Sequence, residues 1–322
     1  ITVPAASACK PSLLSMITWV TRPSAVSACQ MADGRVTHVL IESKDGLQAL
    51  AAGTVIDATG DGLVCRRAGV PMQVSAGGMQ PMSLCFLLRN VDVTTALLRD
   101  HIHHTGLHGQ SKHMGIYHAL QRLAEQGEDV PQFGGPWFNS TMQEDLICVN
   151  ITRAAANAAD RAQLTQAECR MREDAYKLVA LLRKLYPEFA KASIAEIAAQ
   201  GGVRETYHIR GLYTLSGADI LGGAPCADGV AFCSHPVDIH SAQDNTQTAQ
   251  YFDTPCPVPY RVMVAAGFDN LIAAGRCVSC VDEAYASMRV QGTCMAIGEA
   301  AGVAAAMRRE TGCAVTAVNT DA

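Results

Sequence analysis

The chain has 322 residues, of which 49% are hydrophobic and 17% charged, and its formal net charge is −5. This composition is typical of a soluble globular protein, and the length allows two domains, since one core stops growing at about 250 to 300 residues. The negative charge disfavours nucleic acid and anionic membranes as partners, and no apolar run approaches the roughly 20 residues of a membrane span.

Cysteine is plentiful, but the 13 residues are odd in number and show no framework spacing. This pattern favours free thiols in a reducing compartment. We predict no signal peptide, because no basic region precedes the early lipobox-like Ala-Ser-Ala-Cys and the apolar run follows it. We therefore expect a cytoplasmic protein, and we make no prediction of its oligomeric state.

The first 78 residues predict an irregular start followed by strands. Three prolines, at positions 4, 11 and 23, break residues 1–32. From Arg35, the alternating segments VTHVLIES and LQALAAGTVID, separated by Asp45-Gly46, predict a β-meander that leads into a short apolar strand. A segment rich in Gly, Met and Pro then precedes the predicted strand Pro81 to Val93, so we expect a change of domain near Gly78.

The middle of the chain predicts helices and then a strand. We expect helices over Thr94 to His104, Lys112 to Gln126, Asp160 to Leu185 and Ala192 to Gln200. The third has apolar residues at spacings of three and four, which indicate one buried face. Residues Val203 to Tyr213 alternate as a strand does, and the segment that follows to Tyr260 is rich in loops.

Two apolar runs each end at a turn of small residues. Val55-Ile56-Asp57 is followed by Ala58, Thr59, Gly60 and Asp61, and Leu271 to Ala274 is followed by Gly275 and Arg276. Such turns let the backbone approach a ligand at the carboxyl edge of a parallel sheet. Either turn alone is also consistent with an ordinary strand-to-helix connection, whereas the two together favour a ligand site.

A helix rich in Ala and Gly follows Gly292-Thr293, and Thr293 is its predicted N-cap. The unpaired N–H groups at a helix start suit an anion, or a carbonyl that becomes anionic. The sequence therefore predicts that the start of this helix forms another wall of the same ligand site.

Five separated blocks carry a family resemblance that spans Gly34 to Met307. They are VIDATGDG, VRETYHIRGLYTLSGADIL, HPVDIH, PYRVMV, and DNLIAAGRCVS with ASMRVQGTCMAIGEAAGVAAA. In this order they resemble the FAD-dependent oxidoreductases of the glutathione-reductase-like superfamily, within the branch similar to fumarate reductase flavoproteins. The resemblance implies hydride transfer between FAD and a small organic substrate.

The resemblance also implies a fold: an α/β chain in which an FAD-binding Rossmann-like domain holds an inserted α+β substrate or cap domain. The implied parts are residues 1–78 and 261–322 of the FAD-binding domain, with residues 79–260 as the cap. The implied FAD-binding residues are Ala58, Thr59, Gly60, Asp61, Gly275, Arg276, Arg289, Gly292, Thr293 and Cys294. Arg276 stands where the superfamily usually has an acid, and we expect it to bind phosphate or a local carboxylate such as Asp282 or Glu283.

One expected feature is missing from the sequence. A G-x-G-x-x-G turn after a first strand should hold the FAD pyrophosphate, and the chain contains none. We therefore expect an incomplete FAD-binding domain that lacks its N-terminal nucleotide-binding segment. The alternative is a truncated, non-catalytic fragment that does not bind FAD alone.

The predicted catalytic residues centre on RETYHIRG. In an alternating strand, Arg204, Thr206, His208 and Arg210 share one face and Glu205 and Tyr207 the other. Two arginines beside a histidine suit an anionic substrate, with arginine as carboxylate clamp and histidine as proton donor or acceptor. An interface of salt bridges explains the same residues equally well. His240 joins the candidates because the resemblance places its segment at the flavin cleft.

Two further motifs raise a metal- or dithiol-dependent enzyme as an alternative. Six of the ten histidines lie between His101 and His118, with ligand-like pairs His104/His108 and His113/His118. No carboxylate or thiol lies among them, so we predict no metal site. Cys277 and Cys280 form a C-x-x-C motif, which suits either a redox dithiol or two small packing residues at a turn.

Overall fold

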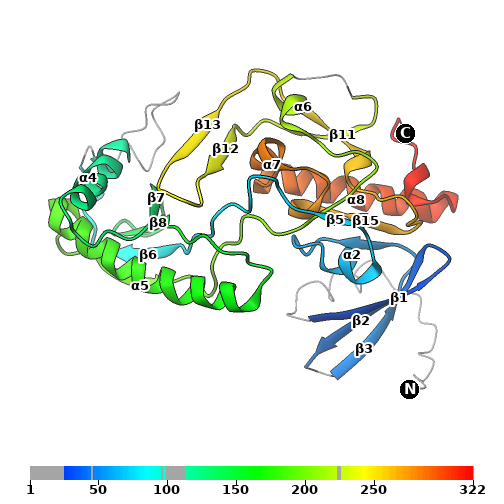
Figure 1. Cartoon of the computed structure of the whole chain (residues 1–322), viewed down its shortest axis with the longest axis horizontal. Coiled ribbons are helices and arrows are strands. Elements are labelled where there is room, and N and C mark those ends of the chain that lie inside the picture. The colour runs from blue at the N-terminus through cyan, green and yellow to red at the C-terminus, as the bar shows by residue number, and fades with distance from the viewer. Residues whose placement is uncertain (1–24, 45, 96, 99–112, 223–225, 322) are drawn as a thin grey trace.

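Figure 1 shows the computed structural model of the chain, which describes residues 25–44, 46–95, 97–98, 113–222 and 226–321. A four-stranded sheet with two helices lies at one end of the molecule, and the long C-terminal helix and a three-stranded meander lie at the other. Helices and sheets thus occur together, in agreement with the predicted α/β class. In the described part of the chain, no helix is both long and apolar enough to span a bilayer.

The antiparallel meander consists of β1 (Ala25–Ala32), β2 (Arg35–Ser43) and β3 (Gly46–Ala51), in that order. The alternating pattern predicted β2 and β3 correctly. The expectation of irregular structure over residues 1–32 is wrong for β1, whose largely exposed positions lack the apolar alternation that identifies a strand. Asp33 and Gly34 both have positive φ, as the two-residue type I′ hairpin between β1 and β2 requires.

Two short parallel strands position the candidate site. They are β4 (Val55–Asp57) and β15 (Leu271–Ala273), and Leu271 pairs with Val55 although more than 200 residues separate them. The buried side chain of Asn270 donates hydrogen bonds to the carbonyls of Val36 (2.9 Å) and Gly53 (3.1 Å), which ties β15 to the meander. Both predicted strands and their parallel relation are confirmed.

An antiparallel sheet of four strands forms the middle of the chain, in the order β7-β8-β6-β9. The strands are β6 (Phe86–Arg89), β7 (Phe133–Ser140), β8 (Leu146–Thr152) and β9 (Ser193–Ile197). The helices α4 (His113–Glu125) and α5 (Arg161–Leu185) share a core with it, followed by η1 (Pro187–Phe189). The predicted long helix is confirmed, and the Asp160 side chain caps it by accepting hydrogen bonds from the N–H groups of Ala162 and Gln163.

Two of the helices predicted for the middle segment are not seen as such in the described residues. The helix expected over Ala192 to Gln200 is wrong, because β9 pairs with β6 there and sheet pairing outweighs the helix propensity of Ala, Glu and Gln. Most of the helix expected over Thr94 to His104 lies outside the described residues.

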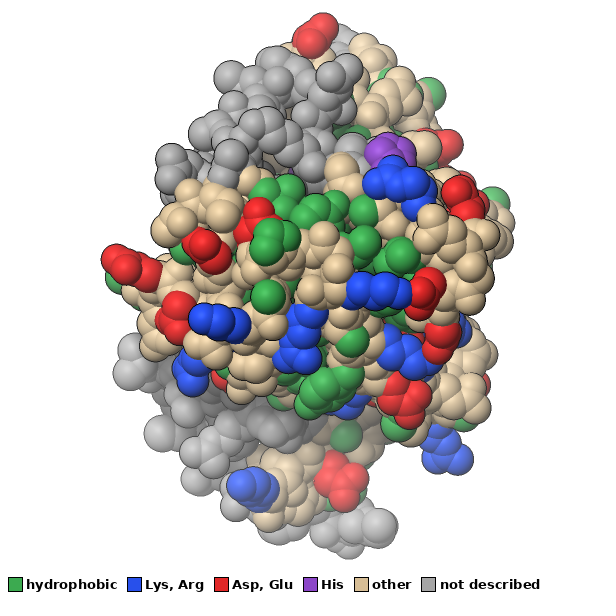
Figure 2. Space-filling model, turned by 90° about the vertical axis from the view of Figure 1, so that its left-hand side faces the viewer, with side chains coloured by type: hydrophobic (Ala, Val, Ile, Leu, Met, Phe, Trp, Pro, Cys, Tyr) green, Lys and Arg blue, Asp and Glu red, His purple; other side chains and the backbone are tan. Residues whose placement is uncertain are grey.

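On the face of the molecule that carries α4 and α5, Figure 2 shows acidic and basic side chains interspersed.

The remaining segments surround β4 and β15. They are α2 (Leu63–Ala68), β5 (Met72–Gln73), β10 (His208–Ile209), α6 (Gly217–Gly222), β11 (Gly229–Cys233), β12 (Val237–His240), β13 (Gln247–Gln250), β14 (Cys256–Pro259), η2 (Tyr260–Val262), η3 (Gly275–Cys277), α7 (Asp282–Met288), α8 (Gln291–Thr311) and η4 (Val315–Ala317). The predicted strand Val203 to Tyr213 is correct for β10 alone, since the residues before it are extended without a neighbouring strand. The sequence did not reveal α7.

Candidate functional site

The turn after β4 is shaped by the buried carboxylate of Asp57. Its Oδ1 accepts hydrogen bonds from the Thr59 N–H (3.0 Å) and hydroxyl (2.7 Å), and its Oδ2 accepts one from the Cys65 N–H (2.8 Å). These bonds fix Ala58 to Asp61, the first set of predicted cofactor-binding residues, at the carboxyl end of β4. The sequence prediction missed Asp57, although an acid followed two residues later by threonine is a recognisable turn signal.

The turn after β15 meets the turn after β4. The Arg276 guanidinium lies 3.4 Å from Oδ1 of Asp61, which also accepts a hydrogen bond from the Thr206 hydroxyl at 2.8 Å. A Cβ on Gly60 would lie 2.6 Å from Nη2 of Arg276, so only glycine allows this approach. The carboxylate partner of Arg276 is thus Asp61, and the expectation of Asp282 or Glu283 is wrong because Arg276 faces the other turn.

The helix α8 begins three residues earlier than predicted. Val290 precedes it with extended backbone and no side-chain cap, while Thr293, the expected N-cap, is buried in the first turn. Gly292 is exposed, and a Cβ there would meet no atom within 4 Å. Cys294 is half-buried, and its N–H donates to the Val290 carbonyl. The N–H groups of residues 291–293 precede the first hydrogen bond within the helix and have no carbonyl partner in it.

Three arginines from distant segments gather around β12. Arg289 donates to the backbone carbonyl and Oδ2 of Asp238, both at 3.1 Å. Arg153, just after β8, donates to Nδ1 of His240 at 3.1 Å. Within the described residues, Asp238 is the only carboxylate hydrogen-bonded to any of the guanidinium groups of Arg153, Arg204 and Arg289.

Arg204 experiences the positive charge of this group most strongly. Burial, followed by the charges of Arg289 and Arg153, lowers its pKa to about 10. Its guanidinium donates to the Pro81 carbonyl (2.6 Å) and the Ser83 hydroxyl (2.8 Å), which fixes it against the segment that leads into β6. The geometry thus places a predicted substrate-binding arginine among like charges.

The ring of His240 joins the group with both nitrogens in use. Arginine can only donate, so Nδ1 accepts from Arg153 and Nε2 donates to Oδ2 of Asp238 at 3.0 Å. Burial lowers the pKa of His240 to about 4. Burial acts to raise the pKa of Asp238, but His240 and Arg289 outweigh it and hold this pKa at about 2. At neutral pH the histidine is therefore neutral and the aspartate ionised.

Glu205 and His208 form a separate, fully buried pair. Nε2 of His208 lies 3.2 Å from Oε1 of Glu205, which also accepts from the Ser75 hydroxyl at 2.5 Å, while Oε2 accepts from the Gln80 N–H at 2.9 Å. Nδ1 of His208 is buried without a hydrogen-bond partner, and its ring packs edge-on against Tyr285. The predicted alternation separated these two residues and is wrong here, since residues 204–207 do not belong to a strand.

Arg210 does not join either group. Its side chain is exposed, beyond β10, and its backbone N–H donates to the Pro71 carbonyl. The predicted pairing of Arg204 and Arg210 on one strand face is thus replaced by Arg204 with Arg153 and Arg289. Arg153 gave no sequence signal, whereas Asp238 lies two residues before His240, on the spacing that shares a strand face.

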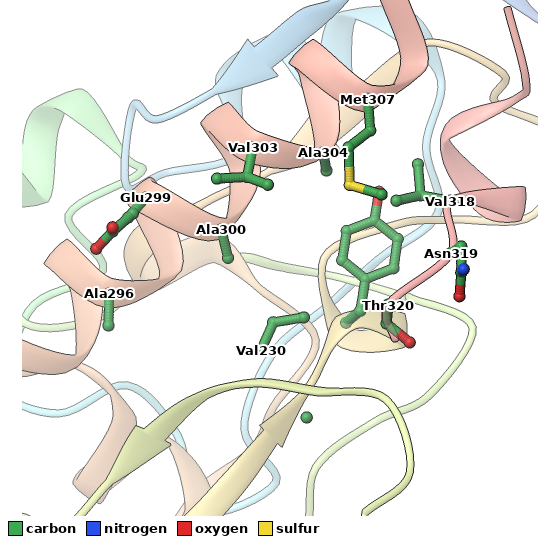
Figure 3. Close-up of a pocket in the computed structure, with 12 residues that line it drawn as sticks. Val230, Ala296, Glu299, Ala300, Val303, Ala304, Met307, Val318, Asn319 and Thr320 are labelled. Carbon is green, nitrogen blue, oxygen red and sulfur yellow. The ribbon is translucent and has the colours of Figure 1, made fainter. Parts of the chain in front are cut away.

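A cavity of about 460 Å³ lies beside both groups. Its wall includes Ser75, Gln80, Glu205, His240 and Asp282. A second, smaller pocket of about 290 Å³ runs along α8, where Ala300, Val303 and Met307 face Val230 and the C-terminal residues (Figure 3). None of the predicted site residues lines the second pocket, so the first is the candidate active-site cavity.

The metal and dithiol motifs do not form sites in the described residues. Among these residues, no three His, Cys, Asp or Glu side chains are grouped to hold a metal ion, and most of the histidine-rich segment, including His104 and His108, lies outside them. Cys277 and Cys280 are both fully buried. Burial raises the pKa of Cys277 to about 12 and that of Cys280 well above its usual value, so both thiols stay protonated and fit the packing interpretation.

Comparison with known proteins identifies the family. The sequence model of a family described as FAD dependent oxidoreductase matches residues 12–322, nearly the whole chain. A comparison with curated proteins found no match. The cofactor of the matched family is FAD, as predicted from the five sequence blocks. The chain belongs to the family of FAD dependent oxidoreductases.

Proposed function

We propose that the chain transfers a hydride between FAD and a small anionic organic substrate. The observation that supports this most is the positive charge of the buried Arg153 and the partly buried Arg204 and Arg289, which have Asp238 as their one hydrogen-bonded carboxylate within the described residues. Removing guanidinium groups from water with one such carboxylate costs free energy that an anion bound among them recovers. A substrate carboxylate is an anion whose geometry suits guanidinium groups.

The residues at the ends of β4, β15 and the start of α8 fit FAD. We assign Ala58, Thr59, Gly60, Asp61, Gly275 and Arg276 to its ribityl and pyrophosphate side, and Arg289, Gly292, Thr293 and Cys294 to the flavin ring. The start of α8 has no side-chain cap, and Nε of Arg289 is buried without a partner. A Cβ on Gly275 would meet no atom within 4 Å, which leaves space for a ligand there. When bound, FAD supplies the hydride acceptor or donor.

The three arginines do not line the cavity themselves, but Arg153 is hydrogen-bonded to His240, which does, and we propose that the arginines bind and orient the substrate at this wall. His240 has both nitrogens occupied and is neutral, so it positions Arg153 and Asp238 rather than exchanging a proton. A proton is better held between Nε2 of His208 and Oε1 of Glu205, which lines the cavity. We assign substrate binding to Arg204 and the holding of the proton to the Glu205–His208 pair. The exposed Arg210 has neither role.

The middle of the chain closes the cavity on its other side. We propose that residues 79–260 form a cap on an FAD-binding part made of residues 1–78 and 261–322. Arg153 and His240 come from the proposed cap, while Arg289 comes from the segment before α8. A cap that contributes charged residues also excludes water, which strengthens their interaction with an anion.

The visible spectrum of the purified chain tests the cofactor assignment. The chain is incubated with excess FAD, desalted and measured, and flavin bands that remain with the protein are the expected result. The Gly292→Val variant narrows the open space at the start of α8 and should retain less flavin, whereas Gly302→Val, at an exposed and open position later in the same helix, serves as the control. A colourless wild-type sample would contradict the proposal for this chain.

A further inference from the structure

Two cysteines meet on one face of the four-stranded sheet. In β8, Ile147, Val149 and Ile151 point into the core, so Cys148 points to the opposite face. Cys148 pairs directly with Leu87 of β6. Cys85 precedes Leu87 by two residues and therefore shares that face, and its carbonyl accepts a hydrogen bond from the Ala198 N–H. The two thiols are diagonal neighbours across adjacent strands.

The two thiols are close enough to share a hydrogen bond, and both are half-buried. The hydrogen bond from Cys85 outweighs burial and lowers the pKa of Cys148 to about 7, while the same bond, burial and the charge of Cys148 raise the pKa of Cys85. Arg204 adds positive charge near Cys85. Partial exposure, a neighbouring thiol and a nearby cation are the surroundings in which thiols react.

Two other pairs of cysteines are not accessible to solvent. Cys233 and Cys256 are directly opposite each other on β11 and β14, but both side chains are buried in the core. Cys277 and Cys280, the C-x-x-C motif, are equally buried. A dissolved disulfide reaches neither pair without unfolding, so of these three pairs only Cys85 and Cys148 can react in the folded chain.

We propose that Cys85 and Cys148 form a thiol–disulfide exchange site. The Cys148 thiolate attacks one sulfur of a small-molecule disulfide, forming a mixed disulfide and releasing one equivalent of the small thiolate. Cys85, after losing its proton to solvent, attacks the Cys148 sulfur and releases the second equivalent. The two protein thiols are thus oxidised to an intramolecular disulfide, and the small disulfide is reduced to two thiols.

The position of the pair connects it to the arginine group. The hydroxyl of Ser83 and the carbonyl of Pro81 accept hydrogen bonds from Arg204, and both residues lie within four positions of Cys85. Diagonal partners start about 7 Å apart, whereas a disulfide holds its Cα atoms at about 6 Å, so closing the bond shifts the start of β6. A bond formed in this way is easily reduced, which suits a reversible site.

Peptide mapping tests the site without reference to flavin. The folded chain is incubated with glutathione disulfide, its free thiols are blocked with iodoacetamide, and it is digested with trypsin without reduction. Residues 68–89 and residues 123–153 are tryptic peptides that contain Cys85 and Cys148 as their only cysteines. The expected product joins these two peptides, and dithiothreitol separates them.

Variants and an internal control complete the test. Cys169 is exposed on α5, so the Cys169→Ser variant should keep the link, whereas Cys148→Ser should lose it. Glutathione bound to Cys169 in the wild type shows that the reagent acted. The proposal is overturned if Cys169 carries glutathione while Cys85 and Cys148 are alkylated separately, or if either forms its link with another cysteine. If a variant fails to fold, the peptide map of the wild-type chain alone tests the proposal.

Discussion

Arg153 and His240 are joined by a hydrogen bond of 3.1 Å, in which the guanidinium donates to Nδ1 of the ring. This bond makes the ring an acceptor on one side and a donor to Asp238 on the other, so the histidine links a cation to an anion while it stays neutral itself. We therefore propose a positioning role for His240, which the sequence indicated as a candidate for proton transfer or anion binding. Its titration has a measurable consequence.

The stability of the protein should depend on pH through His240. In the unfolded chain this histidine gains its proton near pH 6.5, whereas in the folded chain its pKa is about 4. The unfolded state thus binds the proton first as the pH falls, and stability that is complete above pH 6.5 decreases by up to about 3 kcal/mol toward pH 4. Urea unfolding at several pH values should show a smaller loss for His240→Gln, and equal losses for both proteins would contradict the account.

Removing the carboxylate of Asp238 should be costly. The Asp238→Asn variant removes the anion to which Arg289 is hydrogen-bonded and whose charge also acts on Arg153 and Arg204, and we expect a loss of about 3 kcal/mol in the free energy of unfolding. In the control, Asp228→Asn, the lost partner is the half-exposed Arg261, and the expected cost is below about 1 kcal/mol. Denaturant unfolding at pH 7 measures both free energies. Similar losses for the two variants would show that Asp238 is not specially needed to balance the positive charge of the arginines.

The turn after β4 should depend on both carboxylate oxygens of Asp57. In Asp57→Asn the one amide oxygen cannot accept from both Thr59 and Cys65, so a backbone N–H loses its acceptor and unfolding should become easier by about 2 kcal/mol. Asp92 makes the same bonds to Thr94 in an exposed turn, and Asp92→Asn should change stability by less than about 0.5 kcal/mol. If the two variants lose equal stability, burial does not decide the effect.

The sequence predicted the local features of this fold well. The helix α5 has a regular apolar face and an N-cap, and the runs that became β4 and β15 end at glycine turns, so each carries its own signal. By contrast, β9 has a helical composition and forms a strand only because β6 lies beside it. The poorly buried β1 and β9 were thus predicted wrongly, and β11 to β14 lie in a segment that was expected to be rich in loops.

In the candidate site, too, some features follow from local sequence patterns and others depend on tertiary contacts. The turns at Ala58 to Asp61 and Gly275-Arg276 were predicted from local patterns, and β4 and β15 bring them together. Arg153 follows a core strand without any motif, and only tertiary contacts place it beside His240. The pairing of Glu205 with His208 likewise depends on residues 204–207 leaving the sheet, which alternation does not reveal.

The central claim, that Arg204 and its neighbours hold an anionic substrate beside FAD, is tested most directly by titrating the FAD-loaded chain with succinate. The account predicts a saturable change in the flavin spectrum, with at least a tenfold higher Kd for Arg204→Met, because a charge-assisted hydrogen-bonding partner is worth about 1.5 to 3 kcal/mol. Arg210→Met, an exposed arginine six residues away, should titrate like the wild type. A flavin spectrum that does not respond to succinate, or the same Kd for Arg204→Met as for the wild type, would contradict it.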